Sequence, residues 1–219
     1  MTPASDDDLQ AKMEFITAFF DDLNNKIIFL NELYNNGRRD EARVLCSCYI
    51  DWLASALYWP EERNNFNFVR ILREYGAEEI FSFIHPKMLK ASLLKKTGKK
   101  WAAIYSKTSP ILQKALGRLY DEHEIIDLLS SVLSDKEIED VKKELWRGSF
   151  AAIVYNEVRN VSVHSFGPSD GITFDNTLFK GQPCPKIDFA LVYQTLKLLA
   201  SAVQEISLNS TKWFGHDYK

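Results

Sequence analysis

Residues 15–34 read FITAFFDDLNNKIIFLNELY, and the spacing of their apolar side chains decides the fold class. Large apolar residues recur at intervals of three or four positions, which predicts one face of a long amphipathic helix. The sequence after it, Asn35-Asn36-Gly37, is typical of a left-handed cap that ends a helix. The residues of the predicted apolar face are Phe15, Phe19, Leu23, Ile27, Leu30 and Tyr34.

The same periodicity predicts further helices over residues 38–58, 62–75 and 187–208. The short connection between the first two makes them antiparallel neighbours. Only 9 Gly and 7 Pro occur in 219 residues, so few positions interrupt helices. We therefore predict an all-α fold, an up-and-down helical bundle, with a small β-hairpin made by residues 172–174 and 177–179.

The middle of the chain, residues 77–147, is less regular. Pro86, Gly98 and Pro110 divide it, and residues 112–120, 124–133 and 135–146 have helical character. Ser134 or Asp135 suits the N-terminal cap of the last of these helices. We interpret the chain as one domain over residues 1–219, with residues 77–147 as a helical insertion or subdomain.

Charge is distributed unevenly along the chain. The formal net charge is −3, yet residues 80–120 contain nine basic and no acidic residues, so the remainder carries −12. Within this basic stretch, Lys95, Lys96, Lys99 and Lys100 are candidates for RNA contacts, whose binding would weaken with salt. The alternative is a helix face that is simply solvated.

Cysteine and histidine usage indicates no cofactor. Cys46, Cys48 and Cys184 form no metal-binding pattern and are expected to be reduced thiols of a cytoplasmic protein. His85, His123 and His216 have no ligand-like spacing, so we expect no metal. No signal peptide is visible, and no apolar run is long enough to span a membrane.

The candidate catalytic residues lie in Arg159-Asn160-Val161-Ser162-Val163-His164, near the end of a helix predicted over residues 149–164. The arginine suits a phosphate group, and the histidine suits proton transfer near neutral pH. RNA carries its own nucleophile, the 2′-hydroxyl, beside each phosphate. Arg159, His164 and the supporting amide of Asn160 could therefore cleave RNA without a metal.

This motif resembles that of the HEPN superfamily, the higher eukaryote and prokaryote nucleotide-binding domains. The family pattern is Arg, a polar residue and then a His four to six positions on, before a polar turn such as the one at Gly167-Pro168. The helices at residues 9–34, 46–55 and 187–208 look like those of such domains, so the resemblance covers residues 9–75 and 149–208. It implies a bundle that pairs as a homodimer through its motif helices. In active members it implies metal-independent RNA cleavage at the dimer cleft, in toxins or antiviral defence effectors.

Helix geometry also favours a dimer. Five residues at about 100° each place Arg159 and His164 roughly 140° apart on an α-helix, so one motif makes a poor closed site. Two motifs across a two-fold axis would supply both groups to one cleft. Asp51, inside the apolar run of residues 38–58, is either a buried polar group or a neighbour of this site.

Two alternatives to the nuclease stay open. The first is a catalytically inactive RNA-binding or protein-interaction module, in which Arg159 and His164 are structural. The second is a toxin silenced by a cognate antitoxin, for example a nucleotidyltransferase that modifies a residue near the motif. A defence-system partner encoded nearby is a further expectation.

Overall fold

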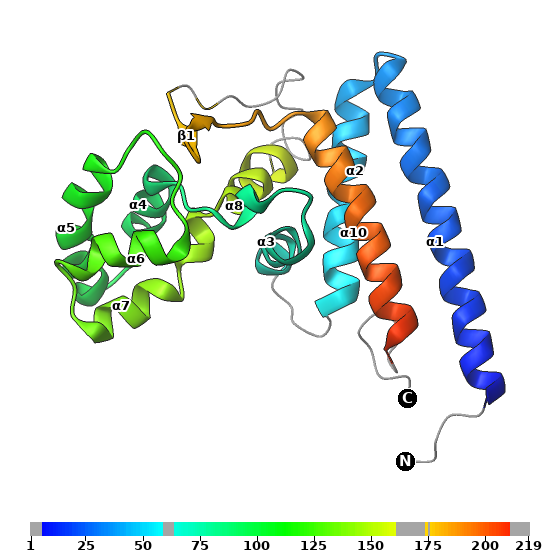
Figure 1. The fold of residues 1–219 in the computed structure, drawn as a ribbon, viewed down its shortest axis with the longest axis horizontal. Coiled ribbons are helices and arrows are strands. Elements are labelled where there is room, and N and C mark those ends of the chain that lie inside the picture. The colour runs from blue at the N-terminus through cyan, green and yellow to red at the C-terminus, as the bar shows by residue number, and fades with distance from the viewer. Residues whose placement is uncertain (1–5, 59–63, 161–173, 175, 211–219) are drawn as a thin grey trace.

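The computed structural model describes residues 6–58, 64–160, 174 and 176–210, and helices make up 77% of them (Figure 1). The predicted all-α class is therefore confirmed. None of the helices in the described ranges is long and apolar enough to cross a membrane. The elements are α1 (Asp6–Asn35), α2 (Arg39–Tyr58), α3 (Asn64–Tyr75), η1 (Glu79–Ser82), α4 (Pro86–Leu94), α5 (Lys99–Lys114), α6 (Glu122–Ser130), α7 (Asp135–Lys142), η2 (Leu145–Gly148), α8 (Phe150–Ile153), η3 (Val154–Asn160), β1 (Leu178–Phe179), β2 (Gln182–Pro183) and α10 (Phe189–Asn209).

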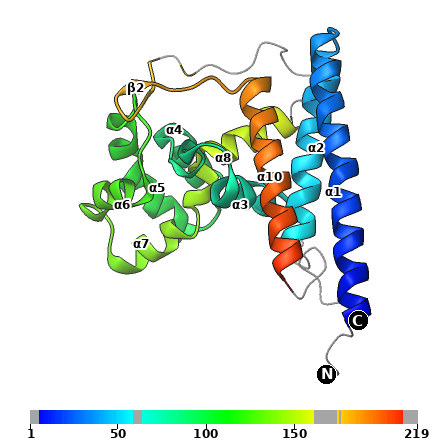
Figure 2. The same cartoon turned by 45° about the vertical axis from the view of Figure 1, so that its right-hand side comes forward.

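Three long helices, α1, α2 and α10, lie side by side in both views (Figures 1 and 2). α1 and α2 are antiparallel, and α10 runs in the direction of α2, while α3 lies across them and is seen almost end-on in Figure 1. The turn after α1 has the predicted cap. Gly37 has a φ of 84°, and the amides of Gly37 and Arg38 donate to the carbonyls of Tyr34 and Leu33.

The apolar face of α1 differs from the prediction at its N-terminal end. Phe15 is 50% exposed, whereas Ile16 and Phe20 are fully buried. Successive steps of four residues drift around an α-helix, while alternating steps of four and three stay on one side. The buried face follows the alternating pattern: Ile16, Phe20, Leu23, Ile27 and Leu30.

The buried apolar residues form two separate clusters. The first lies among α1, α2, α3, α8 and α10 and includes Phe20, Phe68 and Phe150. The second lies among α4–α7 and includes Leu89 and Leu129. The change from one cluster to the other falls between Phe83 and Ile84, inside the segment expected as an insertion, and the insertion itself stays a prediction.

Backbone hydrogen bonds join the two clusters. His85 N–H donates to the Gly148 carbonyl at 2.8 Å, and Phe150 N–H donates to the Phe83 carbonyl at 2.8 Å. Ile84 also exchanges hydrogen bonds with Tyr120. A Cβ at Gly148 would lie 2.8 Å from the Leu89 Cβ, so only glycine fits this close approach.

Two predictions for the middle of the chain need correction, and one is confirmed. Pro110 does not divide the segment, because it lies inside α5. The helix expected over residues 112–120 ends at Lys114, since Tyr120 is drawn into pairing with Ile84. The cap at Ser134 is confirmed, with Glu137 accepting from the Ser134 N–H at 2.9 Å.

The hairpin after the motif is also placed differently. Residues 177–179 were expected to pair with residues 172–174, of which 172 and 173 lie outside the described residues. Instead, Leu178 and Phe179 pair with Pro183 and Gln182. Lys180 and Gly181 form the turn, both at positive φ, as tight two-residue hairpins require.

The second cluster should contribute to stability in its own right. Leu129→Ala, at a fully buried position, should lower the free energy of unfolding by about 2–5 kcal/mol, because it leaves a cavity. Leu128→Ala is the control, since that neighbour is 36% exposed and should cost well under half as much. Urea unfolding measures both, and equal losses would contradict the packing described.

Candidate functional site

The motif arginine, Arg159, lies on η3, which is a π-helix rather than the expected α-helix. A π-helix closes its hydrogen bonds over five residues instead of four, so a step of about 100° per residue does not apply between Val154 and Asn160. The predicted angle between Arg159 and His164 is therefore unsupported along this stretch. His164 and the Asn160 side chain lie outside the described residues.

Arg159 is paired with Asp51. The Nη2 of Arg159 donates to Oδ2 of Asp51 at 3.0 Å, across 108 residues of sequence. Both side chains are largely buried, with 22% and 17% of their surfaces exposed. The structure thus brings Asp51, on α2, to the motif residue that the sequence singled out.

Two further side chains lie beside this pair. Tyr155 lies four residues before Arg159 in sequence, and the centre of its ring is 5.6 Å from the Arg159 Cζ. Cys48 lies three residues before Asp51 in sequence and is close enough to interact electrostatically with both Arg159 and Asp51. Burial raises the pKa of the Cys48 thiol, Arg159 lowers it and Asp51 raises it, and the net shift is upward. Cys48 is therefore a neutral thiol near neutral pH, not a nucleophilic thiolate.

Arg159 stays positively charged beside Asp51. Burial lowers its pKa, but the hydrogen bond and the charge of Asp51 raise it, and the net shift is upward. A held guanidinium of this kind can bind a phosphate through its planar N–H groups. Within the described part of the chain, Oδ1 of Asp51 is buried and has no hydrogen-bond partner, so it can accept one more donor.

Removing Asp51 should destabilise the fold. Asp51→Ala removes the carboxylate that pairs with the largely buried guanidinium of Arg159, and the loss of this charged hydrogen bond should cost about 1.5–3 kcal/mol of unfolding free energy. Asp22→Ala is the matched control, because its ion pair with Lys26 is more than half exposed and should contribute less than about 1 kcal/mol. Denaturant titration compares the two. A loss no greater than that of the control would mean that the Asp51–Arg159 pair carries no stability.

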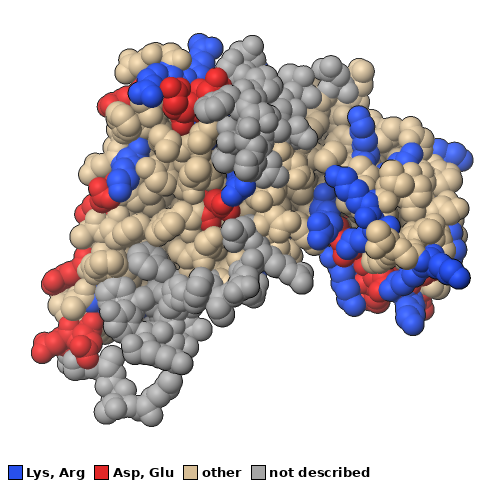
Figure 3. Space-filling model, turned by 180° about the vertical axis from the view of Figure 1, so that it is seen from behind, with Lys and Arg blue, Asp and Glu red and all other residues tan. Residues whose placement is uncertain are grey.

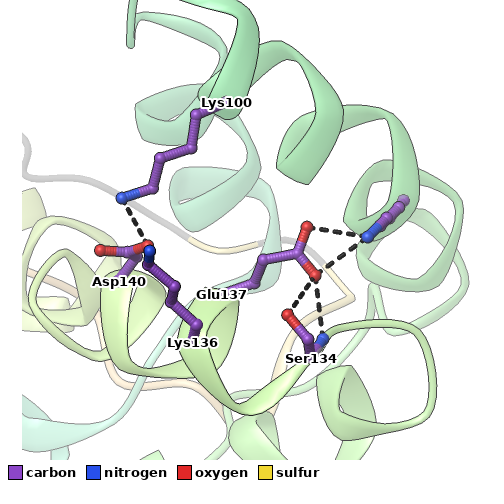
Figure 4. Close-up of a pocket in the computed structure, with 6 residues that line it drawn as sticks. Lys100, Ser134, Lys136, Glu137 and Asp140 are labelled. Carbon is purple, nitrogen blue, oxygen red and sulfur yellow. Dashed lines mark hydrogen bonds and ion pairs between the residues drawn. The ribbon is translucent and has the colours of Figure 1, made fainter.

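The predicted basic surface is partly neutralised by acidic residues that follow it in sequence. Lys96 pairs with Glu144 at 2.6 Å, Lys100 with Asp140 at 2.5 Å and Lys107 with Glu137 at 2.7 Å. Figure 4 shows Lys100 reaching Asp140, and Glu137 turned toward Ser134. Lys95 and Lys99 are exposed and have no ion-pair partner in the described ranges. Of the four expected RNA contacts, two are therefore engaged in ion pairs and two are unpaired.

Figure 3 shows the result on the surface. Lys and Arg side chains gather on the body formed by α4–α7, and acidic side chains lie between them. Residues 121–147 contain nine acidic and four basic residues, so the local excess of +9 in residues 80–120 falls to +4 over both stretches. A moderate positive excess therefore remains over residues 80–147.

Lys107 and Ser134 together perturb Glu137. The hydrogen bond from Lys107, followed by those from Ser134, lowers the pKa of the Glu137 carboxyl from 4.5 to about 2. Since the folded-state pKa is the lower one, the stabilisation is present above pH 4.5 and is lost as the pH falls toward 2.

Lys107→Ala should raise the pKa of Glu137 partway back toward 4.5, with Ser134 retaining part of the depression. Carboxyl carbon chemical shifts followed through an acid titration measure this value directly. Lys99→Ala is the control, because Lys99 has no contact with Glu137 in the described structure, and it should leave the titration unchanged. An unaltered pKa in Lys107→Ala would show that the pair does not form.

The described histidines and cysteines form no metal centre. His85 caps α4, its Nδ1 accepting from the Lys87 amide, and burial and then Lys87 lower its pKa. His123 is exposed on α6 beside Asp127. Among the described residues, no group of three or more His, Cys, Asp and Glu could hold a metal ion. Cys46, Cys48 and Cys184 are free thiols, and burial raises the pKa of Cys46 to about 12.

Sequence reasoning identified Arg159 and left Asp51 with two interpretations, but it did not place Tyr155 or Cys48. Cys48 lies three residues before Asp51 on α2, a spacing that places both on one face of an α-helix and is a usable signal once Asp51 is chosen. Comparisons with family models, with curated proteins and with solved structures find no significant match to this chain. The HEPN resemblance therefore rests on the motif and the order of helices.

Proposed function

We propose that this chain is a metal-independent endoribonuclease of the HEPN type that acts as a toxin or antiviral defence effector. The observation that carries the proposal is the position of the motif arginine. Arg159 lies on the π-helical segment η3 and forms an ion pair with Asp51 of α2. Segments of π-helix inside helices occur frequently at functional sites. A largely buried, permanently charged guanidinium is suited to stabilise the negative charge that develops on a phosphate during cleavage.

The proposed reaction uses the 2′-hydroxyl of RNA as the nucleophile. The 2′-oxygen forms a bond to phosphorus while the bond to the 5′-oxygen breaks, giving a 2′,3′-cyclic phosphate and a 5′-hydroxyl. A base removes the 2′-proton and an acid protonates the leaving oxygen. His164 takes this acid–base role, worth typically about 10²–10⁴-fold. Arg159 binds the phosphate oxygens, and Asn160 orients the phosphate or the imidazole.

A homodimer would supply the second imidazole. Removal of one proton and delivery of another occur on opposite sides of the phosphate, so two histidines serve better than one. In the described part of the chain, His85 is committed to capping α4 and His123 lies exposed on α6. A second copy related by a two-fold axis would bring a second His164 to the same cleft.

A catalytically inactive RNA-binding or protein-interaction module is the second candidate. The ion pair of Arg159 with Asp51 favours it, because a guanidinium already paired with a carboxylate can be purely structural. In that case Arg159 would fix η3 against α2, and the site would carry no chemistry.

RNA cleavage separates these candidates. The wild-type protein should cleave mixed single-stranded RNA in the presence of EDTA, and His164→Ala should reduce the rate by about 10²-fold or more. His123→Ala is the control, because that imidazole is exposed on α6 and should leave the rate unchanged. Absence of cleavage by the wild type, or equal cleavage by His164→Ala, would contradict the nuclease.

The dimer is tested separately by solution mass. Sedimentation or light scattering at micromolar concentration should show a dimer, and a strict monomer that still cleaves RNA would remove the composite cleft from the proposal.

A further inference from the structure

A pocket opens between α4 and helices that carry the first hydrophobic cluster. Its volume is about 360 Å³, within the range of sites that hold small ligands. It lies between α3, α4, η2 and the segment formed by α8 and η3. Its walls therefore come both from the α4–α7 body and from helices of the first cluster. The polar and aromatic side chains that define its chemistry are Lys95, Lys96, Arg147, Trp146, Tyr155 and Asn156.

The charge of the pocket is positive. Three of its lining residues are cations, and none of the described side chains that line it is acidic. Lys96 and Arg147 share one carboxylate, Glu144, at 2.6 Å and 2.8 Å. Lys95, exposed at the C-terminal end of α4, has no ion-pair partner in the described ranges. Two cationic charges are therefore left uncompensated, which favours an anion such as a phosphate group.

The rest of the lining suits a nucleotide better than a bare anion. Trp146 and Tyr155 supply aromatic surface, and Asn156 supplies an amide that can bond the edge of a base. Single-stranded nucleic acids are bound through such pairings of aromatic rings with basic side chains. The two aromatic rings are themselves fixed, because Trp146 packs edge-on against Phe66 and Tyr155 against Phe68.

Tyr155 links the pocket to the motif. It lines the pocket, and its ring centre lies 5.6 Å from Arg159 Cζ. Both residues belong to η3, so a strand with one phosphate at Arg159 would have its neighbouring nucleotide close to this pocket.

We infer that this pocket binds one phosphorylated nucleotide, as the unit of an RNA strand next to the one held at Arg159. The inference rests on the proposed RNA substrate and deepens it by assigning the strand a second contact. A free mononucleotide offers the same phosphate and base, so the experiment uses both kinds of probe.

The binding experiment uses a short fluorescein-labelled oligoribonucleotide and, separately, a free mononucleotide, with His164→Ala as the background so that RNA stays intact. Lys95→Glu should weaken binding of the oligoribonucleotide on the order of tenfold and reduce the salt dependence by about one phosphate contact. Lys114→Glu is the matched control, because Lys114 is exposed at the end of α5 and does not line the pocket. It should change binding less than about twofold.

A second pair of variants tests the pocket without changing charge. Ala91 lines the pocket from α4 and is exposed, so Ala91→Trp should fill it and weaken binding to a similar degree. Ala103→Trp, at an exposed position on α5 outside the pocket, is its control. Circular dichroism melting verifies that all four variants fold.

The outcomes separate the pocket from the nuclease. If the wild type cleaves RNA but both pocket variants bind the oligoribonucleotide like their controls, the pocket inference is wrong and the nuclease stands. If the wild type does not cleave but Lys95→Glu and Ala91→Trp selectively lose RNA binding, the pocket stands without the nuclease. If the mononucleotide binds and the oligoribonucleotide does not, the inferred RNA contact is wrong, and binding of neither probe overturns the pocket altogether.

Discussion

The hydrogen bonds between residues 83–85 and 148–150 are the constraint on which the rest of the structure depends. They hold the start and the end of the segment containing α4–α7 side by side, so that one chain can bury two separate apolar clusters. Gly148 permits the close approach to Leu89 that this joint needs. The segment formed by α8 and η3 follows these hydrogen bonds directly in sequence. They therefore also help to position η3, which carries Arg159, relative to α2.

Folding offsets part of the positive charge that the composition of the middle segment indicates. The acidic residues that offset it lie after it in sequence and form ion pairs with Lys96, Lys100 and Lys107. Partly exposed pairs of this kind contribute little stability each, about 1 kcal/mol or less. Of the four lysines expected to contact RNA, these pairs engage Lys96 and Lys100 and leave Lys95 and Lys99 without an ion pair in the described ranges.

In the proposed site, Arg159 would have both a structural and a binding role. Its pairing with Asp51 ties η3 to α2, and its fixed charge lies beside Tyr155, which opens onto the pocket at the joint. A cation that the fold already holds in place would need less ordering when the proposed ligand binds. The same contact explains why a structural interpretation of the motif competes directly with the catalytic one.

The sequence by itself determined the features that depend on neighbours a few residues apart. These include most of the extent of α1, α2, α3 and α10, the glycine cap after α1 and the Ser134 capping box. Only the tertiary structure decided the pairing of Asp51 with Arg159, the end of α5, the register of the hairpin and the pocket at the joint. Caps and helix periodicity act within one or two turns, whereas ion pairs and pockets form between segments that meet only when distant apolar faces are buried together.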